Sequence, residues 1–258
     1  MEQTEVDVYR AVRTHYQAKL TRMDTSGNDD GCCGSGTGCC SSESVSVAIG
    51  YSAEELATIP ADANLGLGCG NPLRFSGIRQ GDRVLDLGSG GGIDCFIASA
   101  KVGNSGTVIG VDMTAEMVER ARRVAKSRMD YKNVEFRLGE IENLPVADDS
   151  VDLVISNCVV NLSPDKARVY REVFRVLAPG GRVAISDMVA IGDIPEELRG
   201  DPEAYAACIS GAQSVEKTRD NLLAAGFAEV EILVQAELPG EPLVAEYAAP
   251  ALTRARKP

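Results

Sequence analysis

Eight cysteines are the residues with the most distinctive chemistry in this 258-residue chain. Four form the adjacent pairs Cys32–Cys33 and Cys39–Cys40, within a segment of small and polar residues at 25–46. The other four stand apart from one another, at Cys69, Cys95, Cys158 and Cys208. Thiolates act as nucleophiles and as ligands for soft centres. The cysteines therefore indicate either metal or metalloid binding or thiol–disulfide chemistry.

Sequence context distinguishes the four single cysteines. Cys69 stands between glycines that leave its thiol exposed to a partner. Cys158 follows a predicted buried strand, where ligands of α/β proteins bind, although packing as a small apolar residue is the ordinary alternative. Cys208 lies in a predicted short helix at 205–212, where packing alone would explain it. Cys95 has apolar neighbours in a predicted helix, so we expect a core residue.

The common types of zinc site receive little support. His15 is the only histidine, and it lies beside the apolar stripe of a predicted helix at 8–20, so we expect a surface or core-edge residue. The paired cysteines lack the C-x-x-C spacing of zinc ribbons. We favour a mobile thiol arm over a zinc knuckle, and a linker with inert thiols is the alternative.

A glycine-rich loop indicates a cofactor site. Residues 83–87 have the pattern of a buried strand, and Gly88, Gly90 and Gly92 follow it directly. This spacing differs from the G-x-G-x-x-G order of dinucleotide sites. Together with Asp86 it resembles the motif of S-adenosylmethionine-dependent methyltransferases, although an ordinary strand-to-helix turn can look the same.

Acidic residues further along the chain strengthen the case for a nucleoside cofactor. A second predicted strand, 107–112, ends at Asp112, about 20 residues after the glycines, as a ribose-binding carboxylate should. Asp112 could also serve as the N-cap of the helix predicted after it. After the third strand, Glu140 and Ile141 suit an adenine amine and an adenine face.

The elements that position these residues alternate between strand and helix, which predicts an α/β fold with a parallel sheet covered on both faces. Residues 194–214 depart from the alternation and are predicted to be an insertion capping the cleft. Ser52 and Glu55 have capping-box spacing, which predicts a short helix. Strands are predicted at 83–87, 107–112, 134–138, 151–156, 182–186 and 229–235, with an antiparallel strand at 244–248. Helices are predicted at 93–102, 115–128, 165–177 and 215–225.

The same pattern predicts four parts of the chain. These are an N-terminal helix at 1–24, a thiol-rich arm and substrate loop at 25–72, a cofactor-binding core at 73–190, and the capping insertion with the C-terminal strands at 191–258.

Charge and composition restrict the partners. The net charge of −12, from 26 basic and 38 acidic residues, disfavours nucleic acid and favours a small neutral or cationic substrate. Apolar runs are only strand-sized, and the N-terminus has no signal-peptide pattern. We therefore expect no membrane association and a cytoplasmic location.

Five segments together resemble the arsenite S-adenosylmethionine methyltransferases. The resemblance implies a Rossmann-like class I methyltransferase sheet that transfers methyl groups from S-adenosylmethionine to trivalent arsenic, for arsenic detoxification. Its specificity comes from three cysteines in distinctive contexts, because many methyltransferases share the glycine motif. The matching segments are 68–72, 85–95, 110–114, 156–162 and 208–212.

The resemblance also implies roles for individual residues. Cys69, Cys158 and Cys208 would bind the small-molecule arsenical substrate, and Cys32, preferred over Cys33, would relay disulfides to a thiol reductant such as glutathione or thioredoxin. The role of Cys39 and Cys40 stays open. The residues implied in cofactor binding are Asp86, Gly88, Ser89, Gly90, Asp112, Met113, Glu140, Ile141 and Asn157.

Two other functions are compatible with parts of this pattern. One is a C- or O-methyltransferase for a small molecule such as a quinone or sterol precursor, in which the cysteines only pack. The other is a non-catalytic, thiol-rich protein that binds a metalloid or zinc. Asp86 and Asp112 favour a working cofactor site over the second alternative.

Overall fold

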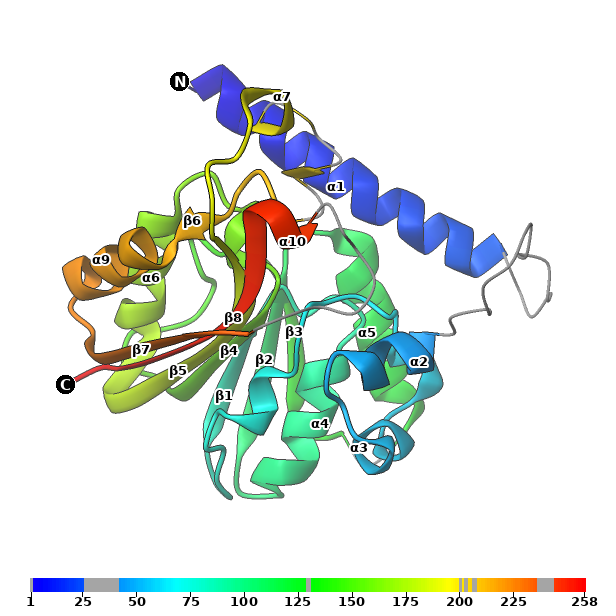
Figure 1. Ribbon diagram of the computed structural model, residues 1–258. Coiled ribbons are helices and arrows are strands. Elements are labelled where there is room, and N and C mark those ends of the chain that lie inside the picture. The colour runs from blue at the N-terminus through cyan, green and yellow to red at the C-terminus, as the bar shows by residue number, and fades with distance from the viewer. Residues whose placement is uncertain are drawn as a thin grey trace.

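A twisted sheet lies at the centre of the computed structural model, with helices on both faces and one long helix across an end of the sheet (Figure 1). The structure describes residues 2–25, 42–128, 131–199, 201, 204–205, 208–235 and 244–258. Cys32, Cys33, Cys39 and Cys40 lie outside the described residues.

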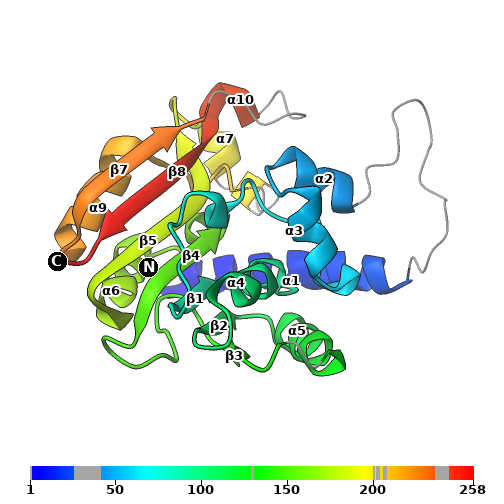
Figure 2. The same ribbon diagram turned by 90° about the horizontal axis from the view of Figure 1, so that it is seen from below.

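The sheet has eight strands in the order β3-β2-β1-β4-β5-β8-β7, and the short β6 pairs with β5. All pairs are parallel except those that β8 makes with β5 and β7. In Figure 2, β7 and β8 form one edge of the sheet, and β3 with α5 lies at the other. The strands are β1 (Arg83–Leu87), β2 (Thr107–Asp112), β3 (Val134–Leu138), β4 (Val151–Asn157), β5 (Leu177–Ala190), β6 (Gln213–Ser214), β7 (Ala228–Val234) and β8 (Ala248–Arg256).

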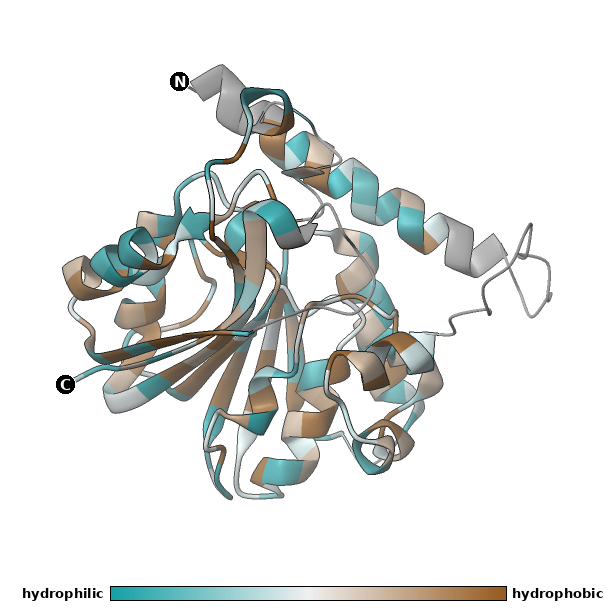
Figure 3. Ribbon diagram, in the orientation of Figure 1, coloured by the Kyte–Doolittle hydropathy of each residue, from teal (hydrophilic) through white to brown (hydrophobic). Residues whose placement is uncertain are grey.

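Helices cover the sheet on both faces because its strands are apolar on both. Adjacent strand residues point to opposite faces, so Val84 joins the apolar cluster of Phe96, and Leu85 joins that of Val173. Figure 3 shows hydrophobic residues along the strands and on the helices beside them. The first cluster lies under α4 (Ile93–Val102) and α5 (Ala115–Ser127), and the second under α6 (Lys166–Val176) and α9 (Val215–Ala225). The predicted α/β architecture is confirmed.

The strand order determines where a ligand can bind. β1 lies between β2 and β4, so the connections leaving β1 and β4 run to opposite sides of the sheet. Parallel sheets bind ligands in the crevice beyond the carboxyl ends of two such strands. The loop at 88–92 follows β1, and Cys158 follows β4, so both border this crevice.

The long helix α1 (Glu2–Thr25) lies across the carboxyl end of the sheet (Figure 1). Its apolar stripe is buried there, and Val12 is only 1% exposed. The helix predicted at 8–20 is confirmed within it. α2 (Ser42–Ala48) and α3 (Ala53–Thr58) follow, and α3 has the predicted capping box of Ser52 and Glu55. The prediction of irregular structure up to residue 46 is wrong from Ser42 onward.

Three further predictions need correction. Residues Val244–Tyr247 form the helix α10, and the antiparallel strand begins only at Ala248. The strand predicted at 182–186 extends from 177 to 190, where β8 pairs with its second half. The helix predicted at 205–212 is wrong for its second half, since residues 208–211 form turns and a bend that follow α7 (Glu196–Arg199).

Among the residues that the structure describes, no helix combines the length and the apolar character that crossing a bilayer requires.

Candidate functional site

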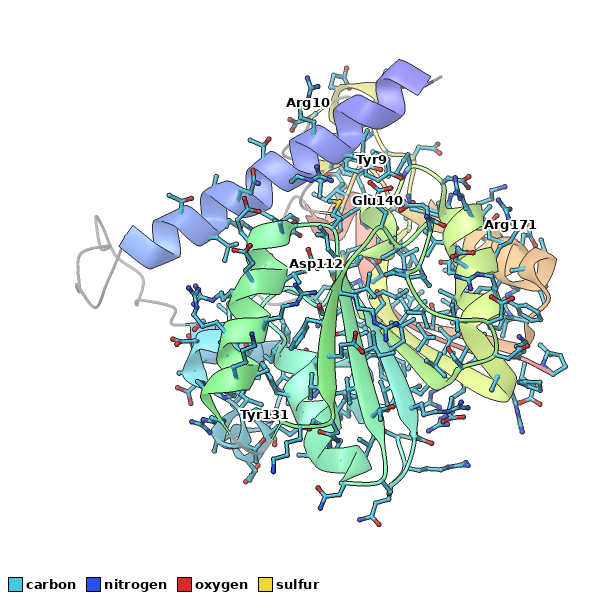
Figure 4. All side chains as sticks on the ribbon, turned by 180° about the vertical axis from the view of Figure 1, so that it is seen from behind. Tyr9, Arg10, Asp112, Tyr131, Glu140 and Arg171 are labelled. Carbon is cyan, nitrogen blue, oxygen red and sulfur yellow. A yellow bond between two sulfur atoms is a disulfide. The ribbon has the colours of Figure 1, made fainter. Side chains whose placement is uncertain are left out.

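A cleft opens at the carboxyl ends of β1 and β4 and holds about 990 Å³ of space, including the part open to solvent. That is enough for a small-molecule cofactor. The glycine loop, the ends of β2 and β4 and the loop after β3 line it from below, and α1 covers it. Figure 4 shows Asp112 and Glu140 at this end of the sheet, beneath α1, which carries Tyr9.

The glycine loop supplies both open space and an unused polar atom. A Cβ on Gly90 would meet nothing within 4 Å, so this position faces open space. A Cβ on Gly88 would run into the side chain of Val159, so packing also requires a glycine there. The buried hydroxyl of Ser89, beside them, has no hydrogen-bond partner among the described residues. A polar ligand in the cleft would have a donor and an acceptor available at Ser89.

Asp112 lies where a carboxylate can face the cleft. Its Oδ2 accepts a hydrogen bond of 2.9 Å from the backbone N–H of Gly90, and its Oδ1 accepts one of 2.8 Å from that of Thr114. Burial raises the pKa of Asp112, and these two backbone donors oppose the shift. The N-cap of α5 is Thr114, so the alternative that Asp112 itself caps the helix is wrong.

Two further acids lie buried under the glycine loop. Asp86 accepts a hydrogen bond of 3.2 Å from the thiol of Cys95, and burial followed by the charge of Asp94 raises its pKa well above the ordinary range. Asp94 accepts one of 2.8 Å from the hydroxyl of Tyr51, and burial raises its pKa to about 7. Cys95 is fully buried, as predicted for a core residue.

Asn157 joins the cleft to the Cys69 loop. Its Nδ2 donates hydrogen bonds of 2.6 Å to the carbonyl of Gly70 and 3.0 Å to the hydroxyl of Tyr51. Its Oδ1 accepts one of 3.0 Å from the backbone N–H of Cys69. A Cβ on Gly68 would lie 2.7 Å from Asn157 Nδ2, so only glycine allows this close approach. We predicted a cofactor-binding residue; Asn157 lines the cleft, but its hydrogen bonds hold the Cys69 loop.

Three cysteines from distant parts of the chain meet at one end of the cleft. Cys69 and Cys158 form a disulfide with a Cα–Cα distance of 5.9 Å across 89 residues of sequence. The thiol of Cys208 donates a hydrogen bond of 3.4 Å to the backbone carbonyl of Cys158. All three belong to one buried cluster with Val12 of α1. The family resemblance implies three thiolate ligands here, and the structure shows two of the three cysteines joined as a disulfide.

The backbone at two of these cysteines is unusual. Cys158 has a φ of 53° and Cys208 a φ of 62°, in the left-handed region that residues with a Cβ rarely adopt. Backbone N–H groups stabilise both positions: Cys158 donates to the carbonyl of Ser186 over 2.8 Å, and Cys208 to that of Tyr205 over 3.0 Å. Such conformations concentrate at functional sites.

Comparison with known proteins identifies the family. Residues 78–233 match the family described as "Methyltransferase domain". An arsenite methyltransferase of Halobacterium salinarum is 50% identical over 95% of this chain and 66% of its own length. One from Aquipseudomonas alcaligenes is 46% identical over 56% of this chain and 43% of its own length. A solved arsenic(III) S-adenosylmethionine methyltransferase from Chlamydomonas reinhardtii is 37% identical, with a TM-score of 0.67, covering 80% of this chain and 72% of that one.

The chain belongs to the arsenite methyltransferase family. The resemblance seen in the sequence is thereby confirmed, as is the Rossmann-like class I methyltransferase sheet. The chain spans less than two thirds of the length of the first curated relatives it matches, 66% of one and 43% of the next.

The remaining residues predicted from the family pattern fall in two places. Met113, Glu140 and Ile141 line the cleft. The predicted relay residue Cys32, with its neighbour Cys33, lies outside the described residues.

Sequence reasoning missed two residues that shape this site. Tyr16 of α1 covers the cleft, and burial raises its pKa, followed by the charges of Cys208 on the thiol side and Asp112 on the glycine-loop side. Asp187, inside β5, lies beside two of the cysteines: one carboxylate oxygen and the sulfurs of Cys69 and Cys158 all lie within 4.8 Å of one another. The apolar stripe of α1 gave a signal for Tyr16, and the end of the predicted strand at 182–186 gave one for Asp187, the residue that follows it.

Proposed function

We propose that this protein transfers methyl groups from S-adenosylmethionine to trivalent arsenic bound by the thiolates of Cys69, Cys158 and Cys208. The observation that carries the proposal is the meeting of these three cysteines at the end of the glycine-loop cleft. Arsenic(III) is soft and prefers thiolate ligands. Relatives named as arsenite methyltransferases support the same reaction, which would serve arsenic detoxification.

The cleft has features that fit the cofactor. S-adenosylmethionine supplies an electrophilic methyl group on a sulfonium centre when bound. Asp112 would accept hydrogen bonds from ribose hydroxyls, and the unpartnered hydroxyl of Ser89 would find a polar partner. The open space at Gly90 admits a ligand against the backbone. Asp86, Gly88, Met113, Glu140, Ile141 and Asn157 complete the proposed set of cofactor residues.

The protein's contribution to the chemistry would be orientation. Asn157 hydrogen-bonds to the backbone of Cys69 and also lines the cofactor cleft. It would therefore fix the position of the bound arsenic relative to the cofactor. A fixed arrangement of two reactants lowers the entropic part of a barrier. No proton must leave an arsenic nucleophile that reacts through its lone pair, in agreement with a described cleft lining that includes no histidine.

Reduction must come before arsenic binding, because the disulfide leaves no thiolate at Cys69 or Cys158. In thiol–disulfide exchange, two molecules of glutathione, or the dithiol of thioredoxin, would be oxidised to a disulfide and leave Cys69 and Cys158 reduced. We assign the relay thiol to Cys32, preferred over Cys33, because the family resemblance includes a fourth cysteine nearer the N-terminus.

The test is incubation of reduced protein with arsenite, glutathione or thioredoxin, and methyl-labelled S-adenosylmethionine, followed by chromatography of the arsenic species. We expect labelled methylarsenicals from the wild type and none from Cys158→Ser or Cys208→Ser. Cys95→Ser is the matched control, because it removes a buried thiol outside the cluster and keeps a hydroxyl donor for Asp86. Full turnover in either cluster variant would refute the arsenic-ligand assignment.

A further inference from the structure

Asp187 is a buried carboxylate held in one orientation beside the cysteine cluster. It is only 8% exposed. Its Oδ1 accepts hydrogen bonds from Asn161 Nδ2 at 2.9 Å and from the backbone N–H of Met188 at 2.8 Å. Its Oδ2 accepts one from the backbone N–H of Asn161 at 3.1 Å. The backbone N–H of Val160 also interacts with this carboxylate. Carboxylates that bind metals are themselves held by hydrogen bonds of this kind, so the arrangement orients Asp187 toward the cysteines.

Two sulfurs share the space beside this carboxylate. The sulfurs of Cys69 and Cys158 and a carboxylate oxygen of Asp187 lie within 4.8 Å of one another. Zinc binds thiolate at roughly 2.3 Å, which separates two sulfurs by about 3.8 Å in a tetrahedral site. The Cα atoms of the two cysteines are 5.9 Å apart. Reduction of the disulfide frees both side chains to rotate, so the two sulfurs can separate to that distance.

Two sulfurs and a carboxylate oxygen form a ligand set that suits zinc, whereas trivalent arsenic does not need the carboxylate. Trivalent arsenic is satisfied by three sulfurs, whereas zinc takes four ligands and accepts sulfur and carboxylate oxygen together. We infer that Cys69, Cys158 and Asp187 of the reduced protein form a zinc site, with Cys208 or a water molecule as the fourth ligand. Hydrogen bonds from Asn161 and Met188 serve as the outer shell that orients the carboxylate.

The charges around this site balance when zinc is bound with water as its fourth ligand. Two thiolates and one carboxylate carry three negative charges, against two positive charges on zinc and one on Lys166. Lys166 is 7% exposed, and its Nζ donates a hydrogen bond of 2.7 Å to the carbonyl of Ser163. Burial lowers the pKa of Lys166, and the charges of Asp187 and Cys208 oppose this shift. The lysine therefore lies close enough to compensate the buried negative charge.

Zinc and arsenite would exclude each other, because both use Cys69 and Cys158. Zinc would also prevent these two thiols from forming their disulfide. The inference does not depend on methyl transfer, since zinc binding is measured without S-adenosylmethionine. Failure of the proposed reaction would leave it standing.

The experiment uses the 258-residue chain with Cys32, Cys33, Cys39 and Cys40 replaced by serine, so that Cys69, Cys95, Cys158 and Cys208 are the cysteines that remain. The reduced protein is titrated with zinc against a chromophoric chelator, and arsenite binding is measured by equilibrium dialysis. We expect one zinc per chain. Oxidation to the Cys69–Cys158 disulfide abolishes binding.

Substitutions in this background separate the two ligands. We expect Asp187→Asn to weaken zinc binding about tenfold or more and to leave arsenite affinity within about threefold. Cys158→Ser should bind neither zinc nor arsenite, and Cys95→Ser, the matched thiol control, should bind both. Retained arsenite affinity in Asp187→Asn also shows that the site is folded. Unchanged zinc affinity in this variant would overturn the inference.

X-ray absorption at the zinc edge covers the case in which Asp187→Asn does not fold. The background protein loaded with one zinc should show two or three sulfur ligands and at least one oxygen at roughly 2.0 Å. A shell of four sulfurs, or no binding at one equivalent, would refute the site.

Discussion

Replacing Asn157 by alanine removes the side chain that joins the cleft to the Cys69 loop. Three hydrogen bonds are lost, to the carbonyl of Gly70, the hydroxyl of Tyr51 and the N–H of Cys69. At about 0.5–1.5 kcal/mol each, the free energy of unfolding falls by roughly 2–4 kcal/mol. For a chain of this length, Tm falls by roughly 5–15 °C.

The same substitution should weaken arsenite binding, because Cys69 is no longer held in place. Ordering the backbone of one residue costs about 1–2 kcal/mol, so we expect a loss of affinity of roughly 5–30-fold. Equilibrium dialysis of the reduced protein, with arsenic quantified by mass spectrometry, measures this loss.

Asn133→Ala is a matched control for this prediction. Asn133 also makes three hydrogen bonds, to the hydroxyl of Ser99 and the carbonyls of Gly103 and Gly106, and it is partly buried like Asn157. We expect a similar fall in Tm and arsenite affinity within about twofold of the wild type. Equal arsenite affinities in the two variants would refute the positioning role of Asn157.

Three further substitutions test the surroundings of the site. Gly68→Ala should lower both Tm and arsenite affinity, because its Cβ would lie 2.7 Å from Asn157 Nδ2. Gly103→Ala is the control, since its Cβ would meet nothing within 4 Å; its backbone strain should lower Tm and leave arsenite affinity unchanged. The Tm of Asp94→Asn should rise relative to that of the wild type as the pH rises. Burial raises the pKa of Asp94 from 3.8 to about 7, so between these pH values the wild type loses stability and the variant does not. Above about pH 7 the difference in Tm becomes constant. An unchanged difference from pH 4 to 8 would contradict this. Ser52→Ala removes the α3 cap and should cost about 1 kcal/mol in chemical denaturation.

The cofactor half of the site was predictable because its signals are local. The strand at 83–87, the glycines after it and the helix at 93–102 form one continuous segment, and the structure has the predicted bounds. β8 was misjudged because its first residues are alanine and proline, which have little strand propensity alone. Nine paired residues on β5 make it a strand. That pairing is invisible to local pattern.

Asp187 could have been predicted by the rule that singled out Cys158, namely that residues at the carboxyl ends of parallel strands border the ligand site. Cys158 was singled out because it follows a central strand, and β5 runs parallel beside that strand. The register pairs Asn157 with Ser186, and the residues that come next along the chain are Cys158 and Asp187. A carboxylate one position beyond a strand partner of Asn157 must therefore lie near the Cys158 backbone. Asp187 is visible in the sequence, but only the pairing of β4 with β5 shows that it lies beside Cys158.

The left-handed backbone at Cys158 and Cys208 explains why the thiol cluster itself could not be derived from elements alone. Each such conformation costs about 1–3 kcal/mol and persists only where the surroundings hold it. Cys158 is held by the carbonyl of Ser186, and the turn at Cys208 packs so closely that a Cβ on Gly211 would run into the carbonyl of Asn161. A regular helix at 205–212 would aim the Cys208 side chain differently. The strained turn is therefore what brings the third sulfur to the other two, and relaxing it should separate the cluster without disturbing the cofactor cleft.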